Sequence, residues 1–308
     1  MSRLTEPLRA RLQETLSGQQ TGLPGWITEF EHGTDAGFFG PGSAVWAVNG
    51  GMSTLVAGVR ALLMQALHPG ALAGVYDWSR FREDPLGRLS GTIRWIFTVS
   101  YGDTTQAVKG SEWVKRLHER VVGEYVDGHG HPARYSANDP DLAKWVHLAF
   151  TDAFLSTYEI WGSGVPGGSD AYVDEWAIAG ELMGVVDPPR TRAELKAALH
   201  GYADAGELRC DDRTREVVRF VRRAPLRRSL RPSYAVLFGG AVASLEPRFR
   251  DLLGLRMPHL GPIQLPATAA TRLVLRGAGS LLGEQTAGER AARVRLEALG
   301  DERQTIRT

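Results

Sequence analysis

Helix-start signals constrain the fold of this 308-residue chain more than any other feature of its sequence. Asp84-Pro85 and Asp139-Pro140 each supply a capping carboxylate followed by a proline, whose fixed φ and missing N–H suit the first helical position. Asp103, followed by Gln106, matches a capping box. These signals predict helices over 85–99, from 103 through the segment that carries His118, and over 141–161.

Apolar residues at helical spacing predict that most of the remaining chain is helical as well. The further predicted helices are 52–67, 171–183, 192–202, 214–222, 234–253, 268–282 and 288–299. Alternating patterns typical of strands are scarce, and residues 127–138 are predicted to form a turn-rich connector. We therefore predict an all-α fold: an N-terminal extension (1–40), a helical domain (41–255), and C-terminal helices with a charged tail (256–308).

Composition excludes several classes of protein. A formal net charge of +1 gives no reason to expect a nucleic-acid partner. Cys210 is the only cysteine, so neither an internal disulfide nor a thiolate metal cluster can form. The best candidate for a transmembrane segment, 55–67, is shorter than the roughly 20 residues required and carries Arg60. With no signal-peptide pattern at residues 1–10, we expect a cytoplasmic protein without a transmembrane segment.

His118 is the residue with the greatest consequence for function. Its predicted helix runs on through Tyr125, and Val114, Val122 and Tyr125 share a face with it, so the imidazole points into an apolar layer. Such a histidine is either a core residue with a hydrogen-bond partner or an axial ligand to a group inserted there. The spacing of apolar residues does not distinguish these two interpretations.

The other histidines have simpler expected roles. His68 is expected to close a helix, where a charged imidazole gains from the helix dipole. His147 lies on a largely apolar helix face, and either faces the same cavity as His118 or is a core histidine bonded to a carbonyl. His129 and His131 form a weak zinc-type pair, with no third ligand nearby in the sequence.

Arg88 and Thr92 lie four residues apart on one face of the predicted 85–99 helix, with Gly91 just before the threonine. A mid-helix glycine costs about 1 kcal/mol relative to alanine, so a close neighbouring backbone or a planar ligand is expected to offset it. Spacing alone favours a helix–helix contact, with the arginine reaching water.

Five stretches, in their order and spacing, resemble the catalytic domain shared by bacterial rubber oxygenases (latex clearing proteins) and fungal MpaB-type oxygenases. They are Met64-Gln-Ala-Leu-His-Pro69, Phe81-Arg-Glu-Asp-Pro-Leu-Gly-Arg-Leu-Ser-Gly-Thr92, Tyr101-Gly-Asp103, Arg116-Leu-His-Glu-Arg-Val-Val-Gly123 and Tyr135-Ser-Ala-Asn-Asp-Pro-Asp-Leu142. The resemblance is clear over about 41–161 and fades beyond. It implies a globin-like helical core with additional helices, in which residues 41–255 bind one b-type haem.

The resemblance also implies roles for particular residues. The family's proximal histidine, which holds the haem iron, corresponds to His118. The distal Arg-Leu-x-Lys-Thr pattern of rubber oxygenases appears as Arg88-Leu-Ser-Gly-Thr92. Arg88 and Thr92 would then stabilise bound dioxygen. Gly91 stands where those enzymes have a lysine that can cap the iron, which implies an open distal position and argues against rubber cleavage itself.

We therefore expect a haem b-dependent oxygenase that uses dioxygen on an apolar, alkene-containing small molecule, with no redox partner indicated. Trp95, Phe97, Phe150 and Phe154 are candidates for the wall of its site. The alternatives are a non-catalytic protein that binds haem or a diatomic gas, and a protein that kept the family fold but lost the cofactor.

Overall fold

The computed structural model describes residues 24–305 apart from 80–81, 84, 261–262 and 284; for residues 85–89, 260, 263 and 301–305 it describes the backbone alone. Most of the predicted extension, and Asp84, therefore lie outside the described residues. The helices are α2 (Gly25–Thr28), η1 (Glu29–Glu31), α3 (Ala44–Gly50), α4 (Thr54–Gln65), α5 (Pro69–Trp78), α6 (Pro85–Tyr101), α7 (Thr104–His118), α8 (Pro140–Trp161), α9 (Ser169–Leu182), α10 (Arg192–Asp204), α11 (Asp212–Arg222), α12 (Arg231–Ser244), α13 (Pro247–Leu252), α14 (Ala267–Leu282) and α15 (Ala287–Thr305). The strands are β1 (Val122–Val126), β2 (Pro132–Ser136), β3 (His259–Leu260) and β4 (Ile263–Gln264), and they form two small antiparallel pairs. The all-α prediction is confirmed as a mostly helical fold.

The predicted helix starts are confirmed where the structure describes them. Asp139 accepts the N–H of Asp141, and Pro140 occupies the first turn of α8. Asp103 and Gln106 form the reciprocal capping box that begins α7. Local hydrogen bonds of this kind join residues two or three apart in the sequence, which is why they can be predicted without tertiary information.

The prediction that the α7 helix continues past His118 is wrong. The helix ends at His118, and Val122 and Tyr125 lie on β1, which pairs with β2. Asp127 builds the turn between the strands, because its Oδ1 accepts the backbone N–H groups of His129 and His131. Part of the predicted connector is therefore the second strand of a hairpin.

Two further boundaries differ from the prediction. The predicted 234–253 helix is two helices, α12 and α13, because Pro247 cannot continue a helix and instead begins the second. Residue Pro69, predicted to stop a helix, also starts α5. His68 is the N-cap of that helix, not the closing residue of the one before, and its Nδ1 accepts the N–H groups of Gly70 and Ala71.

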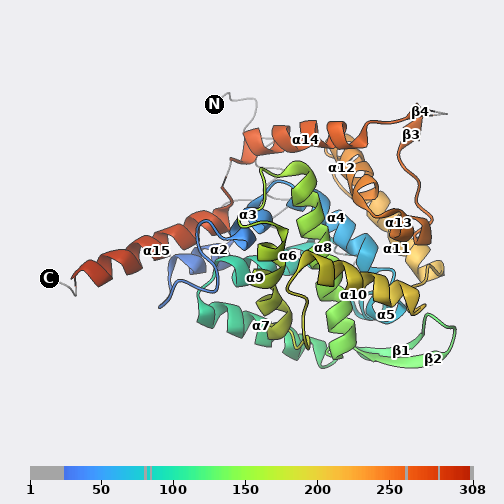
Figure 1. Cartoon of the computed structure of the whole chain (residues 1–308), viewed down its shortest axis with the longest axis horizontal. Helices are drawn as coiled ribbons and strands as arrows, with labels where there is room; N and C mark the ends of the chain where they lie inside the picture. Colours follow the sequence, from blue (N-terminus) through green and yellow to red (C-terminus); the bar gives the residue numbers. More distant parts are fainter. Residues whose placement is uncertain (1–23, 80–81, 84, 261–262, 284, 306–308) are drawn as a thin grey trace.

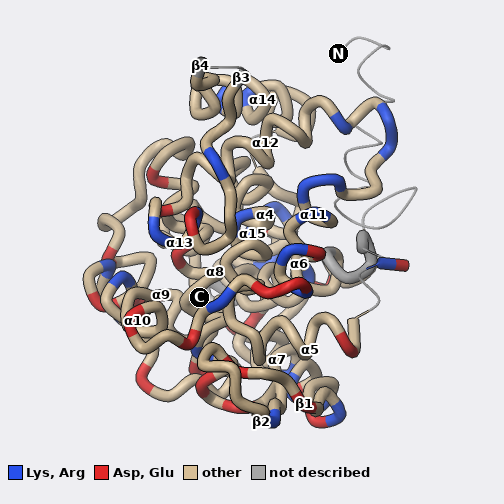
Figure 2. Tube along the Cα trace, turned by 90° about the vertical axis from the view of Figure 1, so that its right-hand side faces the viewer, with Lys and Arg blue, Asp and Glu red and all other residues tan. Residues whose placement is uncertain are grey.

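Helices α4 and α8 lie in the middle of the molecule, with α14 along one side and the β1–β2 hairpin on the opposite side (Figure 1). Both central helices are largely buried. Acidic and basic segments are interspersed along the chain in the turned view of Figure 2. Among the described helices none is individually long and apolar enough to cross a bilayer; α3 and α4 together have the required length and composition but meet at 89°.

Candidate functional site

A cavity of about 460 Å³ lies among α5, α6, α7, α8 and α9. Its wall is mainly apolar and aromatic, and includes Trp95, Ile96, Val114, Phe150, Phe154 and Trp176. Cavities of roughly 300–1,000 Å³ with such walls and few polar groups are typical of small-molecule and cofactor sites. The cavity is therefore the candidate functional site.

Three of the predicted site residues line this cavity. Gly91 and Thr92 come from α6, and His118 comes from the last residue of α7. These positions are distant in sequence from α8 and α9, which form the facing wall. The structure thus brings together residues from four of the five stretches that carry the family resemblance, among them Gln65, Thr92, His118 and Tyr135. The side chain of Arg88 lies outside the described residues, although its backbone belongs to α6.

His118 is half-buried, and the α7 residues Trp113, Val114 and Leu117 line the cavity beside it. Val114 was predicted to share this apolar face with His118. The predicted continuation of the face through Val122 and Tyr125 is absent, because both residues lie on β1. Val122 is exposed on β1, where its carbonyl accepts the indole N–H of Trp78 at 3.1 Å. The apolar layer at His118 is supplied instead by the helices around the cavity, through tertiary packing.

Two glycines on the surrounding helices shape the cavity in different ways. A Cβ placed at Gly91 would meet no described atom within 4 Å. The expected helix–helix contact at this glycine is therefore not found, and the backbone of α6 instead faces open space in the cavity wall. Gly180 on α9 approaches His147, because a Cβ there would lie 3.1 Å from three atoms of the imidazole ring.

His147 lines the same cavity as His118, which decides between its two predicted positions. Its side chain is buried, and its Nε2 atom has no hydrogen-bond partner among the described residues. Burial lowers the pKa of this imidazole to about 4, so it is neutral at physiological pH. A neutral ring with an unpaired nitrogen is suited to accept or donate one hydrogen bond to an occupant of the cavity.

The aromatic wall includes residues that the sequence did not indicate. Trp95, Phe150 and Phe154 line the cavity as predicted, but Phe97 packs against Tyr101 outside it, with ring centroids 5.2 Å apart. Trp176 on α9 was not predicted; its ring lies 6.1 Å from that of Trp95 in an edge-to-face arrangement. The sequence around Trp176 contains no motif, so its place in the cavity wall follows only from the packing of α9 against α8.

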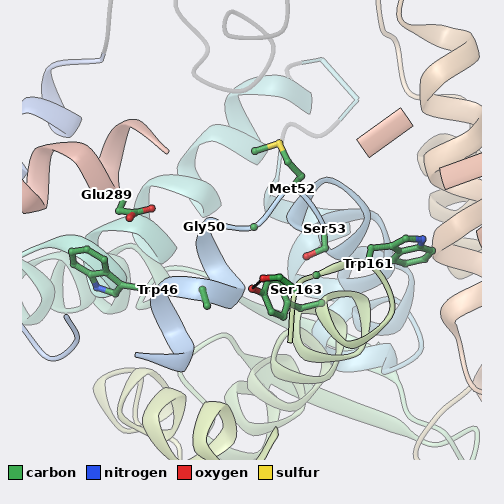
Figure 3. Close-up of a pocket in the computed structure, with 11 residues that line it drawn as sticks. Trp46, Gly50, Met52, Ser53, Trp161, Ser163 and Glu289 are labelled. Atoms are coloured by element: carbon green, nitrogen blue, oxygen red, sulfur yellow. Dashed lines mark hydrogen bonds between the residues drawn. The ribbon is translucent and has the colours of Figure 1, made fainter. Parts of the chain in front are cut away.

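A second cavity of about 410 Å³ lies at the bend between α3 and α4 (Figure 3). Trp46 and Glu289 lie at one side of this view and Trp161 at the other, with Ser163 between them. The Ser163 hydroxyl lies 3.2 Å from that of Tyr158, which ties the 162–169 loop to α8. None of the predicted site residues lines this cavity.

No group of three or more histidine, cysteine, aspartate or glutamate side chains that could hold a metal ion occurs among the described residues. His129 and His131 lie on the exposed hairpin turn, where their backbone N–H groups bind Asp127. A haem iron is already held by its macrocycle and takes as little as one histidine from the protein, so it does not require a cluster of protein ligands. His118 is the imidazole that the family resemblance assigns to this role.

Residues 46–283 match the family described as ER-bound oxygenase mpaB/B'/Rubber oxygenase, catalytic domain. The match extends well beyond 161, where the resemblance in motifs fades, and includes α9 through α14. Comparisons with curated proteins and with solved structures gave no match, and the globin-like arrangement of the core stays a prediction. Because the matched span is more than half of the chain, this protein belongs to the family of mpaB and rubber oxygenase catalytic domains.

Proposed function

We propose that this protein is a haem b-dependent oxygenase that uses dioxygen on an apolar, alkene-containing small molecule. The observation that carries the proposal is that His118, Gly91 and Thr92, from two separate family motifs, line one apolar cavity. Membership of an oxygenase family supports the reaction class. Haem and the alkene go beyond what family membership supports and belong to the proposal.

The residues of the cavity fit a planar, apolar cofactor. Aromatic side chains of Trp95 and Phe150 form part of the wall, and the α6 backbone at Gly91 leaves open space where a side chain would otherwise project. His118 supplies an imidazole from the end of a helix, half-buried at the same cavity. This combination of a largely apolar cavity with one imidazole suits a b-type haem.

When bound, the haem would supply an iron at which dioxygen is bound and activated. His118 would hold that iron through one ring nitrogen. The hydroxyl of Thr92, half-buried on the α6 side of the cavity, would donate a hydrogen bond to negative charge that develops on oxygen. Arg88, one helical turn before Thr92, would add a fixed positive charge.

The apolar walls would select the substrate and exclude water. No lysine or arginine lies among the described residues that line the cavity, so the one cation proposed for the site is Arg88 on α6. Aliphatic and aromatic side chains favour hydrocarbon, because burying apolar surface contributes about 25 cal/mol for each Å². Gly91, in place of a lysine, leaves the α6 side accessible to dioxygen and substrate.

Optical absorption of the purified, haem-supplemented protein tests the proposal. We expect a Soret band that is lost or shifted in His118→Ala, since that variant removes the nitrogen that holds the iron. His131→Ala is the matched control, because His131 lies on the exposed hairpin turn away from the cavity. Protein that takes up no haem, or an unchanged Soret band in His118→Ala, would overturn the proposal.

A further inference from the structure

The cavity has an exposed end and a buried end. Trp78 and Trp113 line it and are 47% and 52% exposed, so they mark the side open to solvent. His147 lines it and is only 7% exposed, and Tyr172 and Ala179, which also line it, are 1% and 0% exposed. An occupant that enters past the two tryptophans therefore reaches His147 at the inner end.

His147 is held firmly but leaves one polar atom unused. The backbone of α9 at Gly180 packs against its ring, since a Cβ at that position would lie only 3.1 Å from the imidazole. The Nε2 atom is buried and has no hydrogen-bond partner among the described residues. Buried polar atoms in folded proteins are nearly always paired, so an unpaired one on a residue that lines a cavity points to a missing partner.

Neighbouring polar groups are engaged elsewhere. The hydroxyl of Tyr172 donates to the side-chain oxygen of Asn49 at 3.1 Å, away from the cavity. The Thr151 hydroxyl donates to the backbone carbonyl of His147, not to its ring, at 2.7 Å. Neither group can therefore satisfy Nε2 without giving up its own hydrogen bond.

We propose that His147 Nε2 forms a hydrogen bond to an uncharged oxygen of the substrate, so that the substrate is a hydrocarbon bearing a hydroxyl or carbonyl group at its inward end. The inference rests on the proposed function, in which this cavity is the substrate site. An uncharged oxygen is favoured over a carboxylate, because the described lining residues include no lysine or arginine to neutralise an anion. The low pKa of His147 agrees with a neutral partner.

The test compares two probes with the same ten-carbon chain, 1-decanol and 1-decene, by equilibrium dialysis against the full-length protein with and without haem. We expect the wild-type protein to bind decanol about tenfold more tightly than decene, the ratio that one hydrogen bond typically supplies. His147→Leu should bind both probes equally, at the level of decene. His147→Gln, which restores a hydrogen-bonding side chain, should recover part of the preference.

Phe150→Leu is the matched control, because Phe150 lines the cavity from the same helix but has no polar atom. It should weaken binding of both probes while their ratio stays the same. Equal binding of the probes by wild-type protein, or a preference that survives in His147→Leu, would overturn the inference. A changed Soret band in His147→Leu would also overturn it, because the imidazole would then be an iron ligand.

The same measurements separate this inference from the proposed function. Protein that prefers decanol but takes up no haem sustains the hydrogen bond at His147 and contradicts the haem-dependent reaction. Protein that binds haem through His118 but shows no preference for decanol contradicts the hydrogen bond alone.

Discussion

Two histidines in this protein are neutral because they are buried, but their surroundings differ. Burial lowers the pKa of His68 to about 4, and its unprotonated Nδ1 accepts two backbone N–H groups at the start of α5. Burial alone lowers the pKa of His147 to about 4. The helix dipole favours negative or neutral acceptors at a helix start, which is the reverse of the stabilised cation expected for His68 from the sequence.

These two histidines predict a pH dependence of stability. A folded-state pKa near 4, against 6.5 in the unfolded chain, means that the unfolded chain binds more protons below pH 6.5. The stability that comes from keeping these two imidazoles neutral is complete above pH 6.5 and is lost as the pH falls toward 4. We expect each to cost about 2 kcal/mol of unfolding free energy at pH 5, from about 1.36 kcal/mol per pKa unit.

Urea unfolding at pH 7 and pH 5 measures this effect. His68→Asn, which keeps an N-cap acceptor, and His147→Leu should each reduce the loss of stability between the two pH values by about 2 kcal/mol. Carboxylates that titrate in the same range are common to all three proteins and cancel in the comparison. Equal losses in the wild-type protein and both variants would contradict the prediction.

A second prediction at the scale of single residues concerns the Thr92 hydroxyl. Thr92→Val removes the hydroxyl but keeps the shape of the side chain, so haem uptake should be unchanged. Dioxygen consumption with an accepted substrate should fall roughly 100-fold, the usual effect of losing one hydrogen bond to developing negative charge. Thr98→Val is the control, since the Thr98 hydroxyl donates to the α6 backbone carbonyl of Arg94 and does not line the cavity. Equal rates in the two variants would remove Thr92 from the mechanism.

At the scale of elements, the β1–β2 hairpin closes one side of the cavity. Val121, before β1, and Tyr135, on β2, both line the cavity, and the hairpin packs against α5. The Tyr135 hydroxyl donates to Asp77 on α5 at 3.0 Å. Gly123 permits this packing, because a Cβ there would lie 2.7 Å from that hydroxyl oxygen.

Gly123→Ala should therefore destabilise the protein by about 1–3 kcal/mol, the usual cost of overpacking a site that cannot relax freely. Thermal or urea unfolding measures the change. The comparison variant is Gly58→Ala on α4, where a Cβ meets no described atom within 4 Å. That substitution should instead gain about 0.5–1 kcal/mol, because alanine favours the helix. If Gly123→Ala were as stable as Gly58→Ala, the close approach at Tyr135 would not constrain the hairpin.

At the scale of the whole molecule, a buried ion-pair network joins four helices. Arg60 on α4 pairs with Asp152 on α8 and also donates to the Ser244 carbonyl on α12. Arg192 on α10 donates to the other oxygen of Asp152 at 2.7 Å. Although burial acts to raise the pKa of Asp152, the Arg60 and Arg192 guanidinium groups hold it below its usual value.

Asp152→Asn should destabilise the protein by about 3–5 kcal/mol, because it leaves the Arg60 guanidinium buried without its counter-ion. Denaturant unfolding checks this, with Asp174→Asn as the control. Asp174 pairs with Arg190 at 2.8 Å, but both side chains are more than half exposed, so its loss should cost less than about 1 kcal/mol. Similar losses in the two variants would show that the buried network does not hold the helices together.

The sequence by itself determined the helices and the family. The capping pairs at Asp103 and Asp139 set helix starts, because their hydrogen bonds reach only a few residues along the chain. The order of the family motifs likewise singled out Thr92 and His118. Both are properties of short segments, and neither needs knowledge of how distant helices pack.

Only the tertiary structure decided what surrounds these residues. The hairpin after His118 forms because β1 pairs with β2, and the cavity includes Gly180 and Trp176 because α9 packs against α8. The position of His147 at the inner end of the cavity depends on the same packing. Contacts between segments far apart in sequence depend on how apolar faces fit in three dimensions, and helical spacing alone does not specify that fit.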